Sequence, residues 1–264
     1  MKNVWALSAI SAALMFFAAC DDSSSATHND DPLSSGTKAW SSSSDDDDKS
    51  VYDAENNTLT DLRDGKTYRT TTISIPEKDY SEVWMAQNLN YETVNSHCYD
   101  DVASNCAKYG RLYAWAAAVG KSESECGYDQ SCDFGTGDVQ GVCPNGWHLP
   151  SKDEFEALIN AAGGSSAAGK ALKSVDGWDD DEYTVPNDDA YSFAALPAGD
   201  YDHGNFRNEG YLAYFWSSTQ YNEGNEYKYN EDNAYDMNLY YSDDYAYLGS
   251  DYKGFGISVR CLKD

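Results

Sequence analysis

The chain is poor in basic residues, and this shortage excludes one large class of functions. Its 264 residues include 18 Lys and Arg against 45 Asp and Glu, which gives a formal net charge of −27. Nucleic-acid binding needs clustered Lys and Arg to neutralise phosphates, so we expect no nucleic-acid partner. The sequence also lacks long apolar runs except at the N-terminus, which excludes a protein with several membrane spans.

Motifs for catalysis and metal binding are missing as well. There is no nucleophile elbow, no P-loop and no HExxH sequence. No His has a helical i, i+4 His partner or a CxxC pair beside it, and we interpret His148 as a hydrogen-bonded core residue. The acidic runs at 179–182 and 188–189 could bind Ca²⁺, but without EF-hand spacing they favour solvated turns. We therefore expect no cofactor, no metal and no catalytic residue.

The first residues form a secretory signal. Lys2 supplies a positive charge, residues 4–17 are predominantly apolar, and Ala18 and Ala19 precede Cys20. Small residues directly before a cysteine resemble a bacterial lipobox, which implies removal of residues 1–19 and attachment of lipid to Cys20. Six cysteines remain after Cys20, an even number that suits disulfides in an oxidising compartment. The alternative is an ordinary signal peptide with an incidental cysteine.

A polar segment, residues 20–57, follows the signal. It consists mostly of Ser, Asp, Asn and Thr, and it cannot bury enough apolar surface to offset the entropy of ordering. We interpret it as a disordered tether. From residue 58 the composition changes, and residues 58–264 form the predicted domain.

Local patterns in this domain predict short, mostly antiparallel strands. Two β-rich runs, 58–63 and 66–75, flank Asp64-Gly65, a pair favoured in two-residue hairpin turns. Residues 83–85 predict a further strand that ends by Asn88. Beyond residue 190 the chain alternates between short strands and polar turns.

The same patterns predict two main helices. Apolar residues at 112, 115, 116 and 119 share one helical face, and Gly120 follows as a stop signal. Ser151 and Glu154 form a capping box that predicts the start of the second helix, which Gly163 closes. Helices set among irregular strands indicate the α+β class.

Six motifs, in order along the chain, resemble one bacterial family. They are DLRDGKTY (61–68), VWMAQNLNY (83–91), CPNGWHLPS (143–151), FAALPAG (193–199), FWSST (215–219) and VRCLKD (259–264). The family is the Fibrobacter succinogenes major paralogous domain, and the likeness runs from about residue 59 to the end. It implies a lipid-anchored protein of the cell envelope, in the outer membrane or at the cell surface. It also implies a C-type-lectin-like fold, which does not by itself give a function.

The six cysteines of the domain admit fifteen pairings, and their spacing favours one. Cys98 with Cys106, and Cys126 with Cys132, can each close a small local loop. Cys143 and Cys261 then remain. A bond between them would close a loop of more than a hundred residues, worth about 4 to 5 kcal/mol in the chain-entropy model.

Residues 211–252 are the predicted recognition segment. They hold 11 of the 22 Tyr, interleaved with Asn, Asp, Ser and Gly, as in antibody paratopes. The predicted ligand-binding residues are Tyr221, Tyr235, Tyr240, Tyr241, Tyr245, Asp243 and Asp244, with Trp216 buried beneath them. The alternative is that these tyrosines pack as ordinary core.

Together these features predict a non-catalytic binding module whose ligand is a carbohydrate or a cell-surface protein. One alternative is a structural envelope protein without a specific ligand, and another is a secreted carbohydrate-active enzyme. A buried carboxylate pair in a deep pocket would favour the enzyme. Exposed aromatic rings gathered on one surface would favour the binding module.

Overall fold

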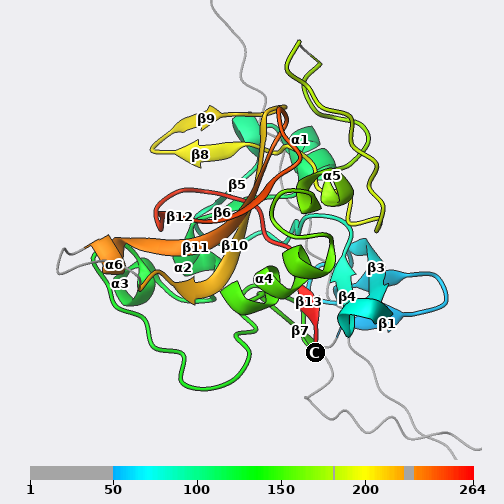
Figure 1. Cartoon of the computed structure of the whole chain (residues 1–264). Helices are drawn as coiled ribbons and strands as arrows, with labels where there is room; N and C mark the ends of the chain where they lie inside the picture. Colours follow the sequence, from blue (N-terminus) through cyan, green and yellow to red (C-terminus); the bar gives the residue numbers. More distant parts are fainter. Residues whose placement is uncertain (1–49, 181, 223–228) are drawn as a thin grey trace, which may run out of the picture. The chain divides into compact units, whose positions relative to one another are not determined.

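The computed structural model describes residues 50–180, 182–222 and 229–264 (Figure 1). The predicted signal peptide, Cys20 and nearly all of the predicted tether lie outside these residues. Within them, short helices and mostly antiparallel strands alternate along the chain, so the predicted α+β class is confirmed. None of the helices in this part of the chain is long and apolar enough to cross a membrane.

The first sheet has six strands in the order β1-β2-β3-β4-β13-β7. Their bounds are β1 Val51–Asp53, β2 Thr58–Thr60, β3 Thr67–Ile75, β4 Tyr80–Met85, β7 Trp147–His148 and β13 Leu262–Lys263. Strand β1 lies inside the predicted tether, so the tether boundary at residue 57 was wrong. The ordered chain begins earlier because β1 pairs with β2 and the Tyr52 ring packs 5.8 Å from the Trp147 ring.

Strands β2 and β3 form the predicted hairpin, but without the predicted two-residue turn. Thr60 pairs with Thr67, which leaves six residues, 61–66, in the loop. The Asp61 side chain is buried and accepts hydrogen bonds from Arg63 Nε at 2.9 Å and Nη2 at 2.7 Å. The loop therefore folds around an ion pair, a contact that the turn pattern of Asp64-Gly65 does not reveal.

The second sheet has three antiparallel strands in the order β10-β11-β12. Their bounds are β10 Leu212–Gln220, β11 Asn233–Tyr240 and β12 Ala246–Tyr252. Two small hairpin-like pairs complete the strands, β5 (Ser96–His97) with β6 (Leu112–Tyr113), and β8 (Asp200–Asp202) with β9 (Asn205–Arg207).

In the part of the chain that the structure describes, six short α-helices connect these strands. They are α1 Ala103–Tyr109, α2 Trp115–Ala118, α3 Glu123–Cys126, α4 Lys152–Ala161, α5 Ala168–Leu172 and α6 Tyr229–Asp232, with 3₁₀ turns at Pro76–Lys78 (η1) and Tyr99–Asp101 (η2). The predicted capped helix is confirmed as α4: Ser151 is its N-cap, and both bonds of the capping box to Glu154 are present. Helix α4 contacts β4 of the first sheet and all three strands of the second (Figure 1).

The other predicted helix is only partly right. Residues 115–118 are helical, but Leu112 and Tyr113 belong to strand β6. The Tyr113 amide donates to the Ile257 carbonyl at 2.8 Å, and Ile257 donates back at 3.1 Å. This pairing with a distant segment overrides the local helical pattern.

All three predicted disulfides are present. Cys98 joins Cys106, Cys126 joins Cys132, and Cys143 joins Cys261 across a separation of 118 residues. The third bond ties the segment before β7 to the segment before β13, so it fixes the two neighbouring strands at the edge of the first sheet.

Arg260, the residue directly before Cys261, is fully buried. Its Nη groups donate to the carbonyls of Phe193 and Ala194, and its Nε donates to Asn88 Oδ1 at 2.8 Å. A buried cation is costly unless its donors are satisfied, so this contact fastens the 193–194 segment to the last strand region.

His148 is a hydrogen-bonded core residue, as predicted. Its Nδ1 lies 2.8 Å from Asp264 Oδ1 and its Nε2 lies 3.0 Å from Glu154 Oε1. Burial by itself lowers the pKa of His148, but the hydrogen bonds to the two carboxylates outweigh it and raise the pKa to about 9. The imidazole is therefore charged at neutral pH and links α4 to the residue after β13.

Candidate functional site

The second sheet presents two chemically different faces, because side chains alternate along each strand. On the apolar face lie Ala213, Phe215, Met237, Leu239, Ala246 and Leu248, which pack in one core cluster with residues of α4. On the polar face lie Tyr214, Asp236, Asn238, Tyr240, Tyr247 and Asp251. The recognition segment therefore contributes to the core and to a polar surface with the same strands.

Five tyrosines lie around the end of the sheet where β11 turns into β12, in two groups. We call them the tyrosine surface: Tyr211, Tyr240, Tyr241, Tyr245 and Tyr247. The rings of Tyr245 and Tyr247 stack with centroids 5.4 Å apart, and the Tyr240 ring stands edge-on to Tyr247 at 5.5 Å. Tyr211 and Tyr241 form a second edge-on pair at 5.0 Å. Tyr211, Tyr245 and Tyr247 are 41%, 43% and 37% exposed, so the Tyr245–Tyr247 stack faces solvent and the Tyr211–Tyr241 pair does so separately.

A buried lysine holds the turn that carries this surface. The Nζ of Lys173, fully buried after α5, donates to the carbonyls of Tyr240 at 2.8 Å and Asp243 at 2.6 Å. Burial lowers the pKa of Lys173 to about 8, and the charges of Asp243 and Asp244 partly oppose that shift. The ammonium group thus replaces water as the partner of two turn carbonyls.

Helix α5 also touches the turn through its backbone. A Cβ on Gly169 would overlap the carbonyl oxygen of Tyr245, so only glycine permits this approach. The Ala246 amide donates to the Ser165 carbonyl at 2.8 Å on the other side of the turn. The tyrosine surface is therefore built on a turn whose backbone is fixed from several directions.

The two predicted acceptors, Asp243 and Asp244, differ in the hydrogen bonds that their carboxylates accept. Asp243 Oδ1 accepts the Tyr245 amide at 2.9 Å and its Oδ2 accepts the Tyr247 hydroxyl at 3.1 Å. Asp243 thus orients two of the tyrosines. The Oδ1 of Asp244 is buried and has no hydrogen-bond partner among the described residues.

Two predicted ligand residues do not join this surface. Tyr235 is only 4% exposed, and the Lys152 ammonium lies 4.6 Å from the centre of its ring. Tyr221 is half-buried and packs on Tyr235 at 5.1 Å. Tyr235 lies five residues before Tyr240 on β11, an odd number that places it on the opposite face and about 17 Å away.

Trp216 is buried, as predicted, but it does not lie beneath the tyrosine surface. Its exposed fraction is 0%, and its indole Nε1 donates to the Tyr113 carbonyl at 2.7 Å. On the sheet it pairs with Asp236, whereas Tyr240 pairs with Leu212 at the other end of β10. Trp216 therefore lies on the same side of the sheet as Asp236, at the other end of β10 from the tyrosine surface, where the core cluster that includes Tyr113 and Ile257 covers it.

Sequence reasoning missed three contributors to the surface: Tyr211, Tyr247 and Lys173. The spacing of Tyr245 and Tyr247 was a usable signal, because residues two apart in an extended chain point the same way. Nothing local indicated Lys173, which reaches the turn from about seventy residues away in sequence.

A pair of carboxylates lies deeper on the polar face. Asp236 is fully buried, and its Oδ2 accepts the Asn238 amide at 3.0 Å, whereas its Oδ1 has no hydrogen-bond partner in the described part of the chain. Burial raises the pKa of Asp236 well above its usual range, and the charge of Asp251 adds to the shift. Burial and the charge of Asp200 likewise raise the pKa of Asp251. The Asp236 carboxyl is therefore held in its protonated form where an ordinary Asp is ionised.

The cavity beside this pair is small. It measures about 230 Å³ and is lined by Asp251, Asp200 and Tyr214 together with residues of the β8–β9 hairpin and the segment after β12. Asp236 is not among its lining residues, so only one of the two raised carboxylates reaches it.

One group of side chains has the composition of a metal site. Ligand atoms of Asp138, His148 and Glu154 lie within 4.8 Å of one another, the only such group of three among the described residues. Both ring nitrogens of His148 already face carboxylates, and its pKa of about 9 means that a metal would have to displace a tightly held proton. We interpret the group as an ion-pair network.

The fold and the site define a disulfide-linked α+β domain with a tyrosine-rich surface. Residues 54–263 match the family model described as the Fibrobacter succinogenes major domain, so the chain belongs to that family, as its motifs indicated. No curated protein matches the chain, and no solved structure matches it.

Proposed function

We propose that this protein is a lipid-anchored component of the bacterial cell envelope, in the outer membrane or at the cell surface. Its domain binds a carbohydrate or surface-protein ligand without catalysis. The observation that carries the proposal is the tyrosine surface on a turn fixed by Lys173 and Gly169. Rings that are already in place lose little conformational freedom on binding, which favours affinity.

We also propose a C-type-lectin-like arrangement for the domain. The support is that the two ends of the domain lie close together: the Lys263 ammonium of β13 is 5.7 Å from the centre of the Tyr52 ring of β1. The family resemblance supports the same fold. Neither point identifies a ligand.

The anchor rests on the sequence before Cys20, with Ala18 and Ala19 directly preceding it. Mass spectrometry of the protein from membranes should find Cys20 as the first residue and carrying lipid. An N-terminus elsewhere, or an unmodified Cys20, would contradict the anchor without affecting the binding domain.

A glycan array and a screen of cell-surface proteins, both probed with the full chain, test the binding function. We expect a ligand whose binding is lost in Tyr245→Ala/Tyr247→Ala and kept in Leu62→Ala. Leu62 is a matched control because it is 45% exposed on the loop of the first sheet. Equal binding by the double variant and the wild type would contradict the proposal and favour a structural envelope protein.

The enzyme alternative has one observation in its favour, the raised pKa values of Asp236 and Asp251. A glycosidase needs two carboxylates that face one substrate across a pocket. Here Asp236 is buried away from the small cavity that Asp251 lines, so we place this function second.

A further inference from the structure

A separate cleft is lined by residues of β5, the β8–β9 hairpin and the segment that follows β12. We call it the histidine cleft. It measures about 400 Å³, within the range of small-molecule sites, and its side-chain walls are Asn95, His97, Glu123, Tyr201 and His203. Tyr252, which packs on His203, lies five residues after Tyr247, or about 17 Å along the strand.

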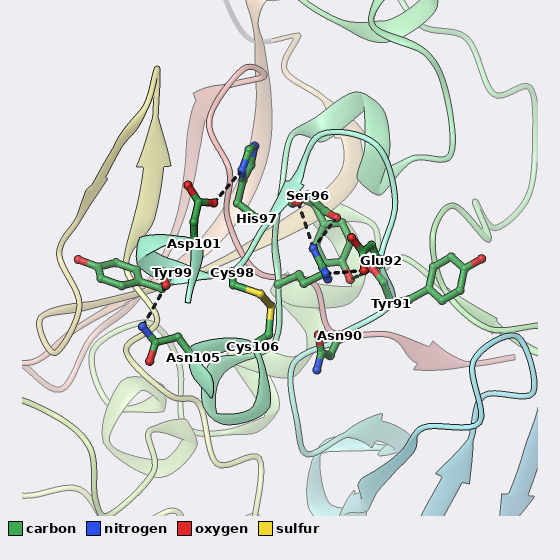
Figure 2. The surroundings of a disulfide bond; sticks show 12 residues. Asn90, Tyr91, Glu92, Ser96, His97, Cys98, Tyr99, Asp101, Asn105 and Cys106 are labelled. Atoms are coloured by element: carbon green, nitrogen blue, oxygen red, sulfur yellow. Dashed lines mark hydrogen bonds and ion pairs between the residues drawn. A yellow bond between two sulfur atoms is a disulfide. The ribbon is translucent and has the colours of Figure 1, made fainter. Parts of the chain in front are cut away.

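One wall of the cleft is an aromatic pair whose backbone is held by a disulfide on one side and by hydrogen bonds on the other. The His97 imidazole stacks on the Tyr201 ring with centroids 4.1 Å apart and an angle of 23°. The next residue, Cys98, is bonded to Cys106, as Figure 2 shows, so the backbone beside His97 is cross-linked to α1. Tyr201 exchanges two backbone hydrogen bonds with Gly256, at 2.9 and 2.8 Å.

Glycines keep the cleft open. A Cβ on Gly256 would lie 3.0 Å from the Cβ of Tyr201, and one on Gly254 would lie 2.7 Å from the Tyr252 ring. Backbone therefore lines this side, and the aromatic rings can approach it closely. The cleft is formed before any ligand arrives.

The polar groups of the cleft combine donors and acceptors without a Lys or Arg in the lining. The Asn95 side-chain amide donates to Glu123 Oε1 at 3.0 Å, and both residues are exposed. His97 Nδ1 lies 3.6 Å from Asp101 Oδ1 (Figure 2), and His203 Nδ1 contacts Asp202. Because a carboxylate lies near each Nδ1, a hydrogen bond from either imidazole to a ligand would use Nε2.

We infer that the histidine cleft is a binding site for an uncharged sugar residue, distinct from the tyrosine surface. Sugar hydroxyls can donate to Glu123 and accept from Asn95, while a C–H face of the ring packs on the side of the His97 imidazole that Tyr201 does not cover. An anionic ligand is disfavoured because the lining offers the Glu123 carboxylate and neither Lys nor Arg. This site adds to the proposed function, since it would hold one sugar unit apart from the surface contact.

The test is calorimetric titration of the full chain with glucose, galactose, mannose and N-acetylglucosamine, with glucuronic acid and glucosamine as charged probes. At least one neutral sugar should bind, and at least tenfold more tightly than either charged probe. Glu123→Gln should weaken that binding at least tenfold, and so should His203→Ala, whose side chain is 74% exposed and lies outside the core. Glu82→Gln, an exposed carboxylate on β4, is the matched control and should bind as the wild type does.

Three results would overturn the inference. They are no binding of any neutral sugar, tighter binding of glucosamine than of every neutral sugar, and unchanged binding in both cleft variants. Tyr245→Ala/Tyr247→Ala separates this site from the proposed one. It should bind the monosaccharide normally, and a loss there would place the sugar on the tyrosine surface, so that the cleft inference fails while the proposed function stands.

Discussion

The two faces of the β10-β11-β12 sheet are made by alternating residues of the same three strands, yet they have different surroundings. The apolar face packs against α4, and its side chains, such as Phe215 and Met237, are fully buried. The polar face carries the buried Asp236 in the middle of β11 and the exposed Tyr247 nearer the turn. The polar face is covered only in part, because buried carboxylates and hydroxyls need a partner or water. The difference shows how one sheet can serve stability on one side and recognition on the other.

The apolar face should show the largest stability effect. Phe215→Ala removes a buried ring that packs 5.9 Å from Phe193, and we expect the free energy of unfolding to fall by about 3–5 kcal/mol. Urea denaturation of the full chain measures it. A loss below about 1 kcal/mol would mean that this face is not the core of the sheet.

Lys173→Met should have the next largest effect, and it acts where the polar face meets the turn. It leaves the carbonyls of Tyr240 and Asp243 without their donor, which should lower the free energy of unfolding by about 1–3 kcal/mol and weaken ligand binding by the tyrosine surface. Lys170→Met is the control, because Lys170 is on α5 but half-exposed. Equal behaviour of the two variants in denaturation and binding would show that the buried lysine does not fix the turn.

The buried carboxyl of the polar face predicts a pH dependence. Because the pKa of Asp236 is raised by folding, the folded state holds a proton that the unfolded state releases above about pH 4, so the free energy of unfolding falls as pH rises from there. Asp236→Asn cannot ionise and should lose less stability between pH 5 and pH 8, by about 1 kcal/mol or more. Parallel denaturation curves for the two proteins at both pH values would contradict the assignment.

The exposed end of the polar face should show the smallest stability effect. Tyr245→Ala/Tyr247→Ala removes two rings that are 43% and 37% exposed, so the free energy of unfolding should change by less than about 0.5 kcal/mol. Thermal and urea unfolding measure this change. A loss as large as that of Lys173→Met would mean that these rings belong to the packing of the domain. The polar face would then have no exposed part to contrast with the buried Asp236.

The features that sequence analysis predicted well depend on residues close together or on few alternatives. The capping box of α4 needs only Ser151 and Glu154, and two of the disulfides close loops of a few residues. The third disulfide followed because only Cys143 and Cys261 were left. The helix expected from residue 112 failed because Tyr113 pairs with Ile257, a contact that no local pattern contains.

The sequence by itself determined the α+β class, the family, the disulfide pairing and the segment that carries the tyrosines, because composition, caps and motif order are properties of the chain. Only the tertiary structure decided which tyrosines reach solvent together. Tyr235 and Tyr240 look alike in sequence, but strand alternation sends them to opposite faces, and Lys173 and Gly169 fix the turn beside only one of them. Exposure depends on what distant segments cover, and that is settled when α5 packs on the turn.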